Sequence, residues 1–142
     1  MTFSWGLFVL AGNPTQHNDE YAGPRNINAD NMFNSPDGLG FDSQGRLWIQ
    51  TDGKDSNKGD FVGQGNNQML MGDPGTGEIR RFMVGPKECE ITGFCWSPDK
   101  RTMFVGIQHP EEKGGSHFPD GGTSVPRSCV IAVTRDDGGV VG

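Results

Sequence analysis

Four residues with side chains that bind cations or move protons occupy matching places in two parts of the sequence. They are Asp37, Asp52, Glu90 and His109. Carboxylate oxygens are the ligands that hard cations such as Ca²⁺ prefer, and a histidine can ligate iron or donate a hydrogen bond to an anion. If the fold brings the four together, their chemistry is that of a metal site with a histidine beside it.

Each of these residues also has an ordinary structural explanation. Asp37 lies in a Pro-Asp-Gly sequence and Asp52 precedes a glycine, and both contexts are common in turns. Glu90 lies between a cysteine and an isoleucine, where no turn requires a glutamate. His109 precedes a proline, which favours extended backbone, and a histidine in a loop is usually solvated. Only the surrounding elements decide between a site and four separate residues.

The elements around these residues follow a pattern of short apolar segments that occurs twice. The first unit contains GLGF, RLWIQT, NQMLMGD and EIRRFMVG. The second contains ITGFCW, the turn SPDKR, TMFVGIQ, a long loop over residues 109–127, and SCVIAVTRD. Ser97 in the second turn lies 54 residues after Ser43 in the first. Short apolar runs between turn residues predict antiparallel strands.

Repeats of about 40 to 50 residues with four strands each are typical of β-propeller blades. We therefore predict an all-β fold with two four-stranded antiparallel blades over residues 35–86 and 87–142, after an N-terminal strand and irregular segment over residues 1–34. A single antiparallel sandwich is the alternative. Because propellers need about four or more blades, two blades are an incomplete ring. We expect either further blades before this chain or a homo-oligomer that closes the ring.

Propeller geometry would bring the four candidate site residues together at the mouth of the central channel. The innermost strand of a blade starts at the central channel, so residues before it and after the next strand face the channel mouth. Asp37 and Glu90 hold the first of these positions, and Asp52 and His109 hold the second. The hairpin-turn residue Asp42 falls at the opposite end and is expected to be structural.

Composition limits the partners. The net charge of −6 argues against a nucleic-acid partner, which would favour a basic face. No apolar run reaches the roughly 18 residues that span a bilayer, so we expect no membrane partner.

The cysteines, Cys89, Cys95 and Cys129, form neither a disulfide framework nor a zinc-finger spacing, and are expected to be small buried hydrophobes. Nothing orients Cys89 and His109 for thiol catalysis.

Several longer strings resemble one family. CEITG and IQHP, together with FSWGLFVLAGNP, DNMFNSPDGLGFDSQGRLWIQTDG and GNNQML, resemble the C-terminal part of the PhoX-type alkaline phosphatases over about residues 3–135. The PDGL string with LWI is shared with gluconolactonase-like propellers, in which the aspartate of that string is similarly a metal ligand. The resemblance implies a six-bladed propeller with calcium and iron at the channel mouth.

By the same resemblance, the activity would be hydrolysis of phosphate-ester small molecules by an exported, Tat-secreted enzyme of the periplasm or the exterior. Asp37 and Glu90 become metal-site candidates, with Asp52 a weaker one, and His109 becomes the candidate that contacts phosphate or metal during catalysis. The family's earlier blades, with a thiolate ligand for iron, have no counterpart here, so we expect little activity from these residues alone. A lactonase-like metal-dependent hydrolase and a non-catalytic propeller scaffold are the alternatives, and CEITG and IQHP favour the phosphatase.

Overall fold

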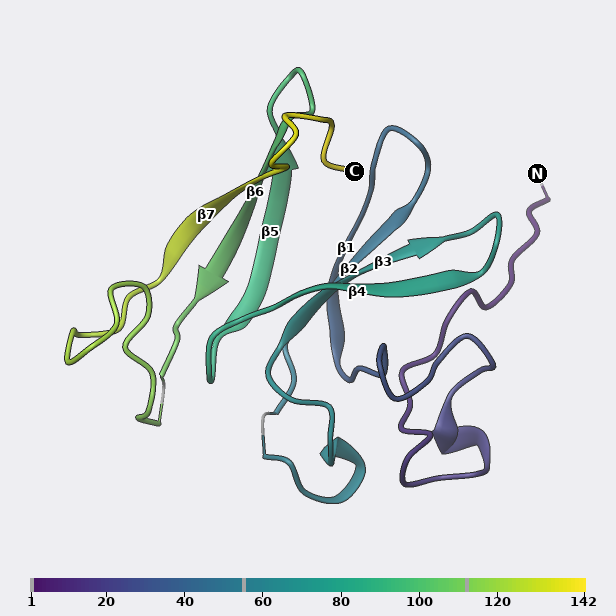
Figure 1. Cartoon of the computed structure of the whole chain (residues 1–142). Helices are drawn as coiled ribbons and strands as arrows, with labels where there is room; N and C mark the ends of the chain where they lie inside the picture. The colour runs from purple at the N-terminus through teal and green to yellow at the C-terminus, as the bar shows by residue number, and fades with distance from the viewer. Residues whose placement is uncertain (1, 55, 112) are drawn as a thin grey trace.

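The computed structural model describes residues 2–54, 56–111 and 113–142, and in these residues the chain forms two antiparallel sheets side by side (Figure 1). The first sheet has the order β1-β2-β3-β4 and the second has the order β5-β6-β7. The strands are β1 (Pro36–Phe41), β2 (Leu47–Thr51), β3 (Gln68–Asp73), β4 (Glu78–Val84), β5 (Glu90–Trp96), β6 (Thr102–Gln108) and β7 (Cys129–Thr134), and the 3₁₀ helices are η1 (Glu20–Ala22) and η2 (Gly59–Phe61).

The predicted all-β fold of consecutive antiparallel strands is confirmed. Every apolar segment predicted after residue 35 forms a strand, and neighbours in each sheet are neighbours in sequence, which is the meander of a propeller blade. The second sheet, however, has three strands in the described part of the chain, where a four-stranded blade was expected. After β7 the sequence turns at Gly138, whose φ is 67°, and Val141 instead donates its N–H to the carbonyl of Lys100 at 2.8 Å.

The opening segment does not form the strand that its apolar residues predict. Gly12 pairs with Phe33 in an isolated antiparallel bridge, while Phe3, Trp5 and Leu7 are 87%, 81% and 73% exposed. A strand needs a neighbour to satisfy its N–H and C=O groups. Within the residues that the structure describes, the β-pairing of this segment is limited to the Gly12–Phe33 bridge, so its apolar character alone does not place it in a sheet.

Two apolar clusters cover the two faces of the first sheet. The larger lies between the sheets, and its buried members are Trp48, Met69, Cys89, Ile91, Met103, Val105, Ile107 and Val141. The smaller lies toward the N-terminal segment, since Phe8 and Val9 pack against it, and contains Ile27, Met32, Phe33, Ile49, Leu70 and Ile79. Trp48 and Ile49 are adjacent in β2, and successive side chains of a strand point to opposite faces. The first sheet is therefore held between the second sheet and the N-terminal segment.

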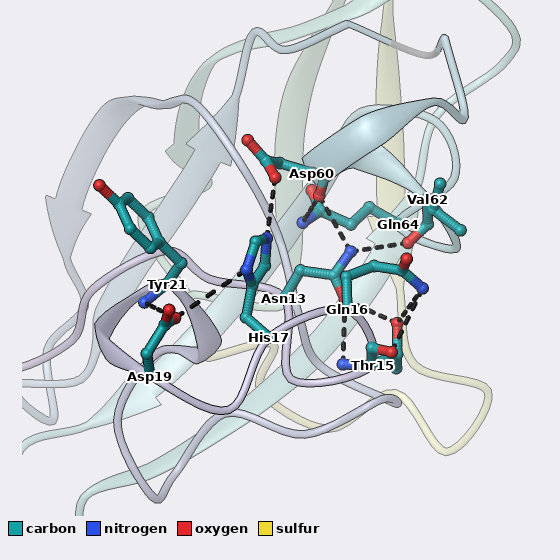
Figure 2. A network of polar contacts seen from close by, with 9 residues as sticks. All are labelled: Asn13, Thr15, Gln16, His17, Asp19, Tyr21, Asp60, Val62 and Gln64. Atoms are coloured by element: carbon teal, nitrogen blue, oxygen red, sulfur yellow. Dashed lines mark hydrogen bonds and ion pairs between the residues drawn. The ribbon is translucent and has the colours of Figure 1, made fainter.

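A polar network fastens the N-terminal segment to the loop between β2 and β3 (Figure 2). The buried side chain of Asn13 donates to the carbonyls of Asp60 and Val62 at 2.9 and 2.8 Å. His17 Nε2 lies 2.8 Å from the Asp60 carboxylate. Because these contacts hold η2 in place, the far half of the loop that follows Asp52 is anchored to the rest of the molecule.

The turn between β1 and β2 is closed by Asp42, as the sequence predicts for an acid at this end. Its carboxylate accepts hydrogen bonds from the backbone N–H of Gln44 and Arg46 at 2.8 and 3.0 Å. It also accepts from Arg46 Nε at 2.7 Å and from Trp48 Nε1 at 3.0 Å. The side chain of Asp42 is only 2% exposed, so this turn is linked directly to the core through Trp48.

No helix in the part of the chain that the structure describes is long and apolar enough to cross a membrane.

Candidate functional site

The four residues singled out in the sequence lie at corresponding ends of strands. Asp37 is the second residue of β1, and Asp52 directly follows β2. Glu90 opens β5, and His109 directly follows β6. Antiparallel pairing puts the start of β1 beside the end of β2, and the start of β5 beside the end of β6. Each sheet therefore brings two of the four residues to one of its ends.

Glu90 connects the pair of residues in the first sheet, Asp37 and Asp52, with its own partner in the second sheet, His109. Its Oε2 lies 3.4 Å from Nε2 of His109, and its side chain is 12% exposed. Burial raises the pKa of the Glu90 carboxyl, and the negative charge of Asp52 raises it further. His109 acts in the opposite direction, and Asp37 adds a smaller increase to the same pKa. Asp37, Asp52 and His109 therefore all lie within electrostatic reach of Glu90.

A polar hollow of about 180 Å³ opens beside Asp52 and His109. The lining residues are Asp52, Gly53, Lys54, Asn67, Glu88, Cys89, His109 and Lys113. Glu88 is held in the wall because its Oε2 accepts a hydrogen bond from the backbone N–H of Lys113 at 2.7 Å. Carboxylate, ammonium, imidazole and amide groups in one wall suit an ionic or strongly polar ligand rather than an apolar one.

The described residues do not complete a metal site. Among residues 2–54, 56–111 and 113–142, no group of three or more His, Cys, Asp and Glu side chains is arranged to hold a metal ion. Calcium takes six to eight oxygen ligands. The carboxylates of Asp37, Asp52 and Glu90 have the right donor chemistry for a hard cation, but they provide at most a share of such a shell.

The residues of the hollow that sequence reasoning missed include Lys54, Asn67 and Lys113. Two of them had a usable signal. Lys54 follows Asp52 by two residues, and Asn67 directly precedes β3, whose antiparallel pairing with β2 brings it to the same end as Asp52. Lys113 had none, because its place depends on the path of a long loop.

The three cysteines differ in environment, and none is in a disulfide. Cys89 is buried, as predicted, whereas Cys129 is half-buried and Cys95 is exposed, so the prediction is wrong for Cys95. Burial raises the pKa of the Cys89 thiol to about 12. Since the thiolate is the nucleophile, the protonated Cys89 is a poor nucleophile at neutral pH.

Alkylation with iodoacetamide at pH 8 is expected to modify Cys95 readily and to leave Cys89 unmodified in the folded protein. The burial of Cys89 and its raised pKa should slow its reaction by roughly 100-fold or more relative to Cys95. Peptide mass spectrometry after timed labelling measures both rates, and urea-unfolded protein is the control in which the rates should converge. Equal rates in the folded protein would contradict the burial of Cys89.

Comparison with known proteins provides a context for this geometry. The sequence model of the family described as "Alkaline phosphatase PhoX" matches residues 1–111. A solved structure described as "Pseudomonas fluorescens PhoX in complex with vanadate, a transition state analogue" is 64% identical, with a TM-score of 0.91. The match covers 94% of this chain and 23% of that chain, so this chain spans about a quarter of the solved protein. Curated proteins gave no significant match.

Proposed function

We propose, because this chain belongs to the alkaline phosphatase PhoX family, that it supplies two sheets and part of the channel mouth of a phosphate-monoester hydrolase. The resemblance drawn from CEITG and IQHP is thus confirmed at the level of the family. The observation that carries the proposal is the gathering of Asp37, Asp52 and His109 around Glu90. The Pseudomonas fluorescens relative is described as holding vanadate, a transition state analogue.

The family is a metalloenzyme family, and calcium and iron are the metals we propose here, by resemblance. In this proposal Asp37, Asp52 and Glu90 donate carboxylate oxygens to calcium, and the remaining ligands come from other blades. A bound metal would neutralise charge on the phosphoryl oxygens and activate the attacking oxygen. His109, held beside Glu90, would contact the phosphate or the metal.

The acids at this end of the two sheets, Asp37, Asp52 and Glu90, lie where a bound cation would stabilise their negative charge. Glu90 is mostly buried, and its Oε2 lies 3.4 Å from Nε2 of the His109 ring. Like charges that share a buried region disfavour ionisation, and the raised pKa of Glu90 reflects burial first and Asp52 next. A cation bound at this end of the sheets would lower the pKa of Glu90 and so oppose both effects. The raised pKa of Glu90 in the metal-free chain therefore supports a metal-binding role.

We further propose that phosphate-ester small molecules are the substrates. The family's enzymes are extracellular or periplasmic, and we propose the same location for the enzyme to which these residues contribute. The missing blades would come either from further sequence or from copies of this chain in a closed ring. Light scattering distinguishes these routes, since a cooperative monomer would count against the homo-oligomer.

The direct test is a hybrid enzyme in which this chain replaces the matching segment of Pseudomonas fluorescens PhoX. The identity of 64% and the TM-score of 0.91 indicate that the backbone will fit. Hydrolysis of p-nitrophenyl phosphate in calcium and iron is expected to remain within about tenfold of the parent enzyme, since conserved geometry preserves transition-state stabilisation.

The matched control is the 142-residue chain alone, under the same conditions. We expect its turnover to stay near the blank, because its described residues lack a complete metal site. Turnover near that of the parent enzyme would overturn the proposed incompleteness. A folded, metal-loaded hybrid without turnover would count against the proposed function itself.

A further inference from the structure

Asn67 makes an unusually complete set of hydrogen bonds at the edge of the candidate site. It is 9% exposed. Its Oδ1 accepts hydrogen bonds from Thr51 Oγ1 at 2.8 Å and from the backbone N–H of Gly53 at 2.7 Å. Its Nδ2 donates to the carbonyls of Gly53 and Cys89 at 3.0 and 2.8 Å. Both donors and both lone pairs of the side-chain amide are thus in use.

These partners lie immediately next to the residues proposed to bind metal. Thr51 and Gly53 stand on either side of Asp52, and Cys89 directly precedes Glu90. Thr51 belongs to β2 of the first sheet, whereas Cys89 leads into β5 of the second. One side chain therefore bonds the backbone beside an acid of each sheet.

We propose that Asn67 is a positioning residue that holds Asp52 and Glu90 in a fixed relation across the junction of the two sheets. This inference rests on the proposed function, since it concerns the same site. Asn67 acts through the backbone on both acids, so its role is to set the spacing of groups that bind the ligand.

The backbone of Asn67 is also held in place. Its carbonyl accepts a hydrogen bond from the N–H of Gly85 at 2.8 Å, at the end of the first sheet. The backbone of Gly53 passes close to Asn34, because a Cβ added at this position would collide with Oδ1 of Asn34. The side-chain amide of Asn67 therefore links the backbone at Gly53 rigidly to the backbone at Cys89. Residues that hydrogen-bond around metal ligands commonly fix them in this way.

The hydrogen bonds that Asn67 donates to the carbonyls of Gly53 and Cys89 fix the backbone directly beside Asp52 and Glu90. The spacing of the two acids is therefore set before any ligand binds. The site is then pre-organised for a cation, and less ordering is needed when the cation binds.

The test is ¹⁵N relaxation of this chain as wild type, as Asn67→Ala, and as Asn67→Asp, which keeps the size of the side chain but loses the two N–H donors. Wild-type order parameters near 0.85 are expected at residues 52–53 and 89–90, falling to below about 0.6 at both places in Asn67→Ala. Asn66→Ala is the matched control, because Asn66 makes a side-chain bond only to the carbonyl of Gly85 at 3.2 Å among the contacts of the described residues.

Order parameters that stay at the wild-type values in both Asn67 variants would overturn the inference. If Asn67→Ala does not fold, Asn67→Asp decides, with loss of order expected at residues 89–90. Calcium titration of the hybrid enzyme by calorimetry supplies the second readout, in which both Asn67 variants should lose at least tenfold in affinity. Loss of order with unchanged calcium affinity would also overturn the positioning role. A hybrid with the wild-type segment that binds no calcium counts against the proposed function, and relaxation then decides the inference alone.

Discussion

Replacing Asp42 with alanine is expected to lower the free energy of unfolding by about 3 kcal/mol. The carboxylate is 2% exposed and accepts hydrogen bonds from Gln44, Arg46 and Trp48. Without it, the Nε1–H of the buried Trp48 loses its acceptor, and an unpaired buried donor costs the full desolvation penalty. Urea unfolding followed by tryptophan fluorescence measures the loss, with the slope against urea expected to stay unchanged.

The matched control is Asp99→Ala in the corresponding turn of the second sheet. Asp99 accepts hydrogen bonds from Ser97 Oγ at 2.7 Å and from the backbone N–H of Arg101 at 3.2 Å. These bonds are exposed, so water can replace them, and the loss should be much smaller than for Asp42. Equal losses at the two turns would show that turn chemistry, rather than the buried link to Trp48, sets the stability.

The dependence on pH gives the Asp42 prediction a second check. Burial by itself would raise the pKa of Asp42, but the hydrogen bonds from Trp48, Arg46 and Gln44 outweigh it and hold the pKa below its ordinary value. A lowered pKa in the folded state stabilises the protein above the unfolded pKa, near 4, and the benefit is lost as pH falls through the lowered value. The stability difference between wild type and Asp42→Asn should therefore be constant from pH 7 to about 5 and shrink toward pH 2.

The strands and the four candidate site residues, Asp37, Asp52, Glu90 and His109, could be predicted because the sequence patterns that indicate them are local. Alternating apolar residues and turn residues specify β2 and β6 within a few positions of the sequence, and the repeat then places Asp52 and His109 at equivalent strand ends. The chemical roles of these residues stay a prediction, since the structure shows their proximity and not their ligands. The division of the chain at residues 35 and 87 likewise stays a prediction.

What could not be predicted depends on contacts between distant segments. The segment around Trp5 has the composition of a strand, but a strand also needs a partner, and composition says nothing about where a partner lies. Asn67 joins Gly53 to Cys89 only after both sheets have formed. The two turns look alike in sequence, yet Asp42 is buried against Trp48 and Asp99 is exposed. Burial of a turn residue is a property of the packed fold and not of the turn motif.

Glu90→Gln is expected to separate function from stability. In the hybrid phosphatase it should lower kcat/KM for p-nitrophenyl phosphate by at least about 100-fold, because a neutral amide is a poorer calcium ligand and the negative charge beside His109 is lost. Asp136→Asn, at an exposed position after β7, is the control and should leave kcat/KM unchanged. A Glu90→Gln hybrid with near-parental kcat/KM would remove Glu90 from the proposed site.

The metal-free chain should respond to Glu90→Gln in the opposite direction. Burial and Asp52 raise the pKa of Glu90, so the ionised carboxylate opposes folding. With a raised folded-state pKa, the contribution of Glu90 to stability is complete below the unfolded pKa and is lost as pH rises through the folded value. At pH 7 the variant should therefore be more stable than wild type by roughly 1 kcal/mol, a gain typical of relieving a strained functional site, and this gain should vanish near pH 4. Thermal unfolding across pH measures it, and a variant less stable than wild type at pH 7 would show that the contact with His109 outweighs the burial and repulsion of Glu90.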